Sequence, residues 1–244
     1  MSQKLFDNEI FFAAYRKLRS EKNYNDLLEQ PAMRRLLPGL KGKAVLDLGC
    51  GYGCGSLFLA QSGAKRVLGI DLSEKMLDVA QKDFCHPLVE YRRMDMEDLS
   101  QLTEAFDLVY SSLAFHYVED FLKLAKDIYR LLKSGGVLLF SQEHPIVTAT
   151  MNCKGHYNLS QDGEYASYTF SDYGRGGKRI GHWFIDGVEN YHRPMGEIVT
   201  TLSQTGFRIE ALVEPLPEPW AVSEKPDLAK EYIKPTFLII KAAK

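Results

Sequence analysis

The stretch "VLDLGCGYG", residues 45–53, joins an apolar run to glycines at every second position, Gly49, Gly51 and Gly53. Within the run, Asp47 places a carboxylate among valine and leucine side chains. Glycine weakens the interior of a strand, and a surface loop does not need an apolar run. The stretch therefore predicts a strand that ends where the backbone must approach a bound molecule.

The composition indicates a single globular domain. The chain has 244 residues, of which 45% are hydrophobic and 25% charged, and its formal net charge is −2. This length allows one α/β domain with additions. The small net charge provides no field that would attract nucleic acid or an anionic membrane. We therefore expect no nucleic-acid partner, with tRNA left open.

The sequence contains no recognisable targeting or membrane segment. It has no run of about 18 apolar residues, and "MSQKLFDNEI" lacks the basic-then-apolar pattern of a signal peptide. Its four cysteines form no C-x-x-C pair, and no metal-ligand cluster with recognisable spacing occurs. We expect a cytoplasmic protein without membrane association or a bound metal.

Strand-like and helix-like segments alternate along the chain. Strands are predicted at 44–49, 66–71, 88–94, 106–112 and 137–142, with two closing strands in "FRIEALVEP" and "PTFLIIKA". Helices are predicted at 8–37, at 55–63, after the N-cap Ser73, from about Val118 to Gly135 and Gly136, and at 197–206. The alternation predicts an α/β fold with a doubly wound, mostly parallel seven-stranded sheet of the Rossmann-like type. Ligands of such a sheet bind outside the carboxyl ends of its strands.

We expect one domain over residues 1–244 with four parts. These are an N-terminal helical cap (1–39), a cofactor-binding core (40–145), an aromatic-rich insertion after the fifth strand (146–193) and a closing helix with strands (194–244). The insertion is predicted to act as a lid over the substrate, because connections of this length in compact domains are usually functional. Asp186 and Gly187 predict a hairpin turn that places His182, Phe184, Glu189 and Tyr191 on one face.

Two kinds of ligand suit a glycine-rich loop after the first strand, a dinucleotide and S-adenosylmethionine. The dinucleotide pattern G-x-G-x-x-G/A would place Cys54 or Ser56 at its third position, although Gly55 lies one residue away. A pyrophosphate would also be repelled by the carboxylate of Asp47. S-adenosylmethionine carries an ammonium and a sulfonium, which favour a nearby carboxylate, so the residues favour this cofactor.

Five ordered motifs resemble those of class I S-adenosylmethionine-dependent methyltransferases, in the small-molecule, type 11-like branch. They are "VLDLGCGYG", "VLGID", "RRMDMEDL", "FDLVYSSLAFHYVED" and "LLKSGGVLLFSQEHP". The resemblance covers residues 40–145 strongly and 195–242 moderately. Asp71, which follows Gly49 by 22 residues, would bind both ribose hydroxyls, since a carboxylate can accept two hydrogen bonds.

The resemblance also implies further cofactor contacts. It places Leu72 and Met76 beside the adenine, Asp95 on the adenine amino group, Met96 on the ring, Ser111 facing the cofactor and His116 close by. In "AAYRKLR" it suggests Tyr15 and Arg19 as residues that close over the methionine end. A guanidinium binds a carboxylate with two hydrogen bonds, although an amphipathic helix with a solvated basic face explains the same stretch equally well.

The function expected from this resemblance is transfer of a methyl group from S-adenosylmethionine to an oxygen or nitrogen atom of a small-molecule acceptor, which yields S-adenosylhomocysteine. Positioning supplies much of the acceleration of an in-line displacement, and a hydroxyl or ammonium acceptor also needs a base. Glu143 and His144 end the fifth predicted strand, so both should lie at the rim facing the acceptor. We predict His144 as that base, with His192 second. The alternatives are a protein that binds S-adenosylmethionine without catalysis, or a nicotinamide-dependent oxidoreductase. The acceptor, the methylated atom and the oligomeric state are left open.

Overall fold

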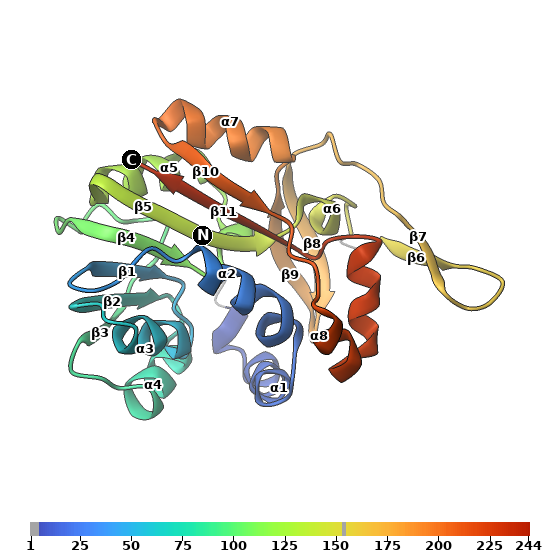
Figure 1. Cartoon of the computed structure of the whole chain (residues 1–244), viewed down its shortest axis with the longest axis horizontal. Helices are drawn as coiled ribbons and strands as arrows, with labels where there is room; N and C mark the ends of the chain where they lie inside the picture. The colour runs from blue at the N-terminus through green and yellow to red at the C-terminus, as the bar shows by residue number, and fades with distance from the viewer. Residues whose placement is uncertain (1–4, 153–154) are drawn as a thin grey trace.

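A twisted seven-stranded sheet forms the centre of the molecule (Figure 1). The computed structural model describes residues 5–152 and 155–244. The strands follow the order β10-β11-β5-β4-β1-β2-β3. Neighbouring strands from β5 to β3 pair in parallel, whereas β11 runs antiparallel to both β5 and β10. The predicted α/β class and the mostly parallel seven-stranded sheet are confirmed.

The elements have the following bounds. The strands of the large sheet are β1 (Ala44–Leu48), β2 (Arg66–Asp71), β3 (Val89–Arg93), β4 (Phe106–Ser111), β5 (Leu132–Glu143), β10 (Arg208–Val213) and β11 (Phe237–Ala243). Two further pairs are β6 (His156–Leu159) with β7 (Tyr165–Thr169), and β8 (Gly177–Trp183) with β9 (Ile185–His192). The helices are α1 (Glu9–Ser20), α2 (Gln30–Leu36), α3 (Cys54–Gln61), α4 (Glu74–Asp83), α5 (Phe121–Leu131), α6 (Pro145–Thr148), α7 (Met195–Thr205) and α8 (Pro219–Glu224). The short helical turns are η1 (Leu5–Asp7), η2 (Asn25–Glu29), η3 (Phe115–Tyr117) and η4 (Pro226–Tyr232).

Both faces of the sheet are covered by helices. Successive strand residues point to opposite faces, so Leu46 and Leu48 of β1 pack in one apolar cluster with α5 and α7, while Val45 packs in another with α2 and α3. All five residues of β1 are buried. A strand covered on both faces needs a continuous apolar run, which explains the run that precedes the glycines.

Two predicted helices have different bounds in the structure. The helix expected over 8–37 is broken, because the Asn23 side chain accepts hydrogen bonds from the backbone N–H groups of Asn25 and Asp26 and starts a new helical segment at η2. The helix expected from Val118 begins after Asp120, whose carboxylate caps it, and ends at Leu131. Residues 132–136 extend β5 instead, since Gly135 and Gly136 both pair with Lys244.

The segment between β5 and α7 contains two hairpins. The β6–β7 hairpin projects away from the sheet (Figure 1), and β8–β9 packs against the N-terminal helix through an apolar cluster that includes Phe11, Trp183 and Phe184. The hairpin predicted around Asp186 and Gly187 exists, but its turn lies at Phe184, between the paired residues Trp183 and Ile185. The centroids of the Phe184 and Phe11 rings lie 5.5 Å apart, so tertiary packing overrides the local turn preference.

The shifted turn changes the predicted face of the hairpin. Glu189 pairs with Ile180 and Tyr191 with Lys178, and exposed His182 bonds Asp186 across 2.8 Å.

Within residues 5–152 and 155–244, no helix has the length and apolar character needed to cross a membrane.

Candidate active site

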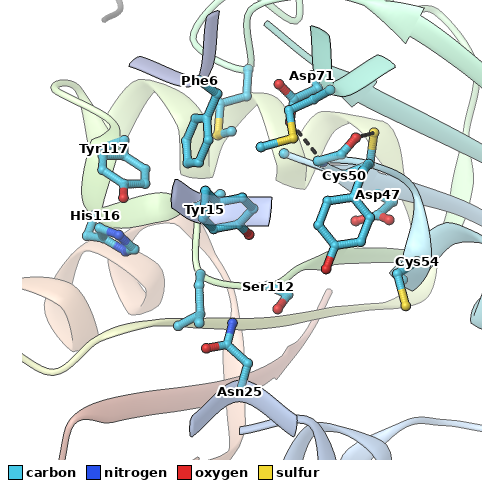
Figure 2. A pocket seen from close by; sticks show the side chains of 18 of the residues that line it. Phe6, Tyr15, Asn25, Asp47, Cys50, Cys54, Asp71, Ser112, His116 and Tyr117 are labelled. Atoms are coloured by element: carbon cyan, nitrogen blue, oxygen red, sulfur yellow. Dashed lines mark hydrogen bonds between the residues drawn. The ribbon is translucent and has the colours of Figure 1, made fainter. Parts of the chain in front are cut away.

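A cavity of about 380 Å³ lies at the carboxyl ends of β1, β2, β4 and β5 (Figure 2). This volume is typical of small-molecule sites. Every residue predicted to bind the cofactor lines it except Ser111. The lining members are Tyr15, Arg19, Asp47, Gly49, Gly51, Asp71, Leu72, Met76, Asp95, Met96 and His116. The structure therefore brings together residues spread over about a hundred positions of the sequence.

The glycine loop has two different steric reasons for lacking side chains. Gly49 has φ +71°, and a Cβ there would lie 2.6 Å from the Ala114 Cβ and 2.9 Å from the Met96 Cε. Gly51 has φ +55°, but a Cβ there would meet no protein atom within 4 Å. Left-handed backbone favours glycine at both positions. Gly49 thus permits close packing within the protein, whereas Gly51 leaves the cavity floor open to a ligand.

Asp71, the last residue of β2, is fixed by two backbone N–H groups. Gly51 N donates to Oδ2 across 2.9 Å, and Ser73 N donates to Oδ1 across 2.8 Å. Burial raises the pKa of Asp71, and these two donors oppose the rise. The carboxylate is therefore held in one orientation at the cavity wall, with lone pairs left for a ligand.

Asp47 lies beneath the glycine loop on the α3 side of β1. Ser56 of α3 donates a hydrogen bond of 2.6 Å to its Oδ2. Burial raises the pKa of Asp47 to about 7, although the Ser56 hydrogen bond opposes this rise. A cation in the cavity would favour the charged form of this carboxyl.

Helix α1 brings Tyr15 and Arg19 to the glycine loop. The Arg19 Nε donates to the Tyr52 hydroxyl across 2.8 Å, and its NH1 donates to Asn23 Oδ1 across 2.9 Å. The Tyr15 ring lies 6.3 Å from the Tyr52 ring and 5.9 Å from the Trp183 ring. Arg19 is thus anchored beside the loop through Tyr52, a contact that the sequence analysis missed although Tyr52 belongs to the glycine motif.

Ser111 does not reach the cavity. Its buried hydroxyl donates to the Leu48 carbonyl across 2.7 Å, which ties β4 to β1. The next residue, Ser112, lines the cavity instead and donates to the Glu29 carboxylate across 3.0 Å. The prediction was displaced by one residue, because neighbouring residues at a strand end face different ways.

The cavity has a second end, opposite the Asp71 side. Figure 2 shows His116 and Tyr117 across the cavity from Asp71 and Cys50. Glu143, the last residue of β5, also lines the cavity, and its backbone N–H donates to His116 Nδ1 across 3.3 Å.

The titrating groups of this second end are strongly perturbed. Burial raises the pKa of Glu143 to about 7, against the opposing charge of Lys234. Burial, together with the charge of Arg193, lowers the pKa of His116 to about 3. Near neutral pH this end therefore combines a neutral imidazole with a carboxyl able to accept or release a proton.

The β8–β9 hairpin lines the cavity through Trp183, Glu189 and Tyr191, and β9 lies against η3, which carries His116 and Tyr117. Its Asn190 does not line the cavity but donates from Nδ2 to the Glu143 Oε2 across 3.3 Å. The insertion thus contacts both the cavity and the carboxylate of Glu143.

Neither predicted catalytic histidine reaches the cavity. His144 follows Glu143 but turns away, where its Nδ1 accepts from Ile146 N and its Nε2 donates to Glu214 across 2.8 Å. The buried His192 accepts from the Thr148 hydroxyl and donates to the Tyr173 carbonyl, each across 2.9 Å. Burial lowers the pKa of both rings. These contacts suit residues that hold the insertion in place, and the geometry gives no support to a direct role of either ring as base.

Sequence reasoning missed several groups at the second end, and some left a signal. Glu143 is not among them, because the sequence predicts it at the rim facing the acceptor, and it does line the cavity; what the sequence misassigns is the role of base, which it gives to the neighbouring His144. Tyr117 lies next to the predicted His116, and Glu189 and Tyr191 belong to the predicted hairpin face. Trp183 could not be singled out from the sequence, because it is one of many aromatic residues in the insertion.

Comparison with known proteins identifies related chains. A family model described as a methyltransferase domain matches residues 46–140. An uncharacterized protein of Haemophilus influenzae is 38% identical over 249 residues, which cover 98% of this chain and 96% of that protein. The ubiquinone biosynthesis O-methyltransferase of Coxiella burnetii is 38% identical over 104 residues, which cover 42% of this chain and 44% of that enzyme.

Among solved structures, an S-adenosylmethionine-dependent methyltransferase from Mesorhizobium loti superimposes with a TM-score of 0.82 at 36% identity. The match covers 88% of this chain and 97% of that protein. The similarity therefore extends well beyond the glycine loop.

Proposed function

The chain belongs to the class I S-adenosylmethionine-dependent methyltransferases, and from that premise we propose that it methylates an oxygen or nitrogen atom of a small-molecule acceptor. The observation that carries this proposal is a single cavity with two chemically different ends. One end is lined by Asp71 and the glycine loop, and the other by Glu143, His116 and aromatic rings. A transfer between two bound molecules requires such adjacent subsites.

The first end fits S-adenosylmethionine. The Asp71 carboxylate is preoriented by Gly51 N and Ser73 N and suits a diol such as the ribose hydroxyls. Gly51 leaves open space where a side chain would otherwise stand. Leu72, Met76 and Met96 line the cavity as apolar walls for the adenine, and Asp95, which also lines it, is proposed to accept from the adenine amino group. When bound, S-adenosylmethionine supplies a methyl group activated by a sulfonium.

Arg19 and Tyr15 are proposed to hold the methionine end. The Arg19 guanidinium uses its Nε and one NH1 hydrogen to bond Tyr52 and Asn23, and its NH2 lies 3.5 Å from Asp26 Oδ1. A guanidinium has five N–H groups, so it retains donors for a carboxylate. Asp47, beneath the loop, favours a cationic group above it.

The acceptor is proposed to occupy the second end, between the ends of β4 and β5 and the β8–β9 hairpin. Glu143 takes the proton that the acceptor loses, because a base with a pKa of about 7 is matched to neutral pH. His116 stays neutral. Its Nδ1 accepts from Glu143 N, which leaves Nε2 as the nitrogen that carries the proton. Tyr117, Trp183 and Tyr191 exclude water from the site.

We propose that residues 146–193 act as the lid of this site within a single domain. The hairpin β8–β9 packs on α1 through the Phe11 and Trp183 rings, 5.1 Å apart. The lid and the N-terminal cap therefore close the cavity together. The two alternative functions, binding without catalysis and nicotinamide-dependent oxidation, are not favoured by the family of this chain.

The experiment is a transfer assay with methyl-labelled S-adenosylmethionine. The purified protein is incubated separately with a bacterial small-molecule extract, with total RNA and with a heat-treated protein fraction. We expect label in the small-molecule fraction and its loss in Asp71→Asn, and mass spectrometry of the product would identify the methylated atom. Label confined to RNA or protein would refute a small-molecule acceptor.

A further inference from the structure

The second end of the cavity is lined by acidic side chains. Two carboxylates line it, Glu143 and Glu189. The arginines that line the cavity are Arg19 and Arg34, which come from α1 and α2 and contact Tyr52 and the Phe58 ring beside the glycine loop. Among the described residues, no lysine or arginine lines the second end. An acceptor bound there meets negative charge.

The nearby cations are engaged behind the cavity wall. Lys178 pairs with Glu189 across 2.5 Å. Lys234 is buried and donates to the Thr236 hydroxyl across 3.1 Å. The buried Arg193 donates to backbone carbonyls, including that of Phe115. Lys178 and Lys234 offset part of the acidic charge, but none of the three lines the cavity.

Aromatic side chains complete this end. Tyr117, Trp183 and Tyr191 line it together with the two carboxylates. The negative face of an aromatic ring attracts an ammonium, most strongly when the cation leaves water. Rings and carboxylates in one cavity therefore select the same kind of ligand.

Two buried oxygen atoms near Glu143 have no donor among the described residues, Asn190 Oδ1 and Gln142 Oε1. The Asn190 amide bonds Glu143 through Nδ2. A half-turn of that amide would present Oδ1 instead, which accepts from a protonated Glu143. Asn190 can thus serve both protonation states of Glu143, as a base that takes up a proton requires.

We propose that the acceptor is a primary or secondary amine, held as an ammonium against Glu143 and Glu189 by the rings of the second end. This inference rests on the proposed function. The ammonium transfers one proton to the Glu143 carboxylate. The freed nitrogen lone pair then forms the C–N bond to the methyl carbon while the C–S bond breaks, and its electrons remain on the sulfur. The products are a methylated ammonium and neutral S-adenosylhomocysteine.

Other acceptor classes fit this end less well. A carboxylate would face Glu143 and the Lys178-paired Glu189 with no cation lining the site beside it, which costs binding energy. An alcohol gains nothing from the carboxylates as charges and would leave the aromatic faces without a cation. The site therefore favours amines over both.

The test uses matched probes and the protein saturated with S-adenosylhomocysteine. Titration calorimetry compares 2-phenylethylamine, 2-phenylethanol and phenylacetate, and likewise tryptamine, tryptophol and indole-3-acetate. We expect each amine to bind about tenfold more tightly than its alcohol, and the carboxylates not to bind. Glu143→Gln should remove this advantage while leaving alcohol binding within about twofold, since a charged partner strengthens the hydrogen bond. The matched control is Glu164→Gln, at an exposed position outside the cavity.

The outcomes separate the two proposals. An alcohol or carboxylate that binds as tightly as its amine overturns the amine inference, as does failure of both amines to bind. In each case normal binding of S-adenosylhomocysteine leaves the methyltransferase function intact. Loss of S-adenosylhomocysteine binding by the parent protein would instead refute the proposed cofactor site. In the transfer assay, labelled products retained by a cation exchanger at pH 5 support the inference, and neutral or anionic products refute it.

Discussion

Gly49 and Gly51 provide a direct test of how the glycine loop works, because an added methyl group has a different effect at each. Gly49→Ala must place its Cβ within 2.6 Å of the Ala114 Cβ, at a φ of +71°. The left-handed backbone costs about 1 kcal/mol for alanine. Overpacking a filled core adds about 1–3 kcal/mol. We therefore expect a loss of about 3 kcal/mol in the free energy of unfolding.

Gly42→Ala is the matched control. Gly42 has φ +72°, and a Cβ there meets nothing within 4 Å, so this variant carries the backbone cost without the clash. For a protein of this size, 1 kcal/mol corresponds to about 2–4 °C in Tm. Gly49→Ala should thus melt about 6–12 °C below the parent protein and Gly42→Ala only about 2–4 °C below it.

Gly51→Ala should lose little stability but should bind the cofactor more weakly. Its φ is +55° and its Cβ would meet no protein atom within 4 Å, so the loss of stability should match that of Gly42→Ala. Because Gly51 lines the cavity, the methyl group would stand where the cofactor approaches, and we expect affinity for S-adenosylhomocysteine to fall about tenfold. Urea unfolding and titration calorimetry measure the two effects. Equal stabilities of Gly49→Ala and Gly42→Ala, or unchanged affinity in Gly51→Ala, would refute this steric reasoning.

Three further predictions concern charged and polar groups. Asp71→Asn should weaken S-adenosylhomocysteine binding by about 10–100-fold in calorimetry, because it removes a charged acceptor; an unchanged Kd would exclude Asp71 from the ribose site. The folded-state pKa of Asp47 is about 7 against 3.8, so the native protein retains a proton that the unfolded chain loses. As the pH rises from about 4 to 7, the free energy of unfolding should therefore fall by at most about 4 kcal/mol. Urea unfolding should find a smaller fall in Asp47→Asn, and equal falls would contradict the raised pKa of Asp47. Asn190→Leu removes an amide that bonds Glu143. Its hydrogen bond to the charged carboxylate is stronger than its bond with the neutral carboxyl, so the apparent pKa in the kcat profile should rise above that of the parent; an unshifted profile would show that Asn190 does not influence the base.

The first end of the cavity could be predicted from sequence because its residues lie in continuous motifs. The glycine loop directly follows β1, and Asp71 is the last residue of β2. Parallel strands bring their carboxyl ends to one edge, so position in the motif is enough to place these side chains. Ser111 shows where this reasoning ends, since its hydroxyl bonds the Leu48 carbonyl and Ser112 lines the cavity.

The histidines predicted as the catalytic base lie outside the cavity, for a related reason. Glu143 and His144 are adjacent, and residue type favoured the histidine as a base near neutral pH. The structure directs Glu143 into the cavity and His144 toward Glu214. Burial then moves the pKa of Glu143 to about 7. Neither the direction of a side chain nor its desolvation can be deduced from residue type alone.

The second end also depends on contacts between segments that are distant in sequence. Trp183 of β8 packs against Phe11 and Tyr15 of α1, and Asn190 of β9 contacts Glu143 of β5. These contacts fix the turn at Phe184, against the local signal of Asp186 and Gly187. The methyltransferase match ends at residue 140, before Glu143 and the whole insertion. Family membership therefore accounts for the cofactor, whereas the choice of acceptor must be deduced from the shape and charge of the end that the insertion builds.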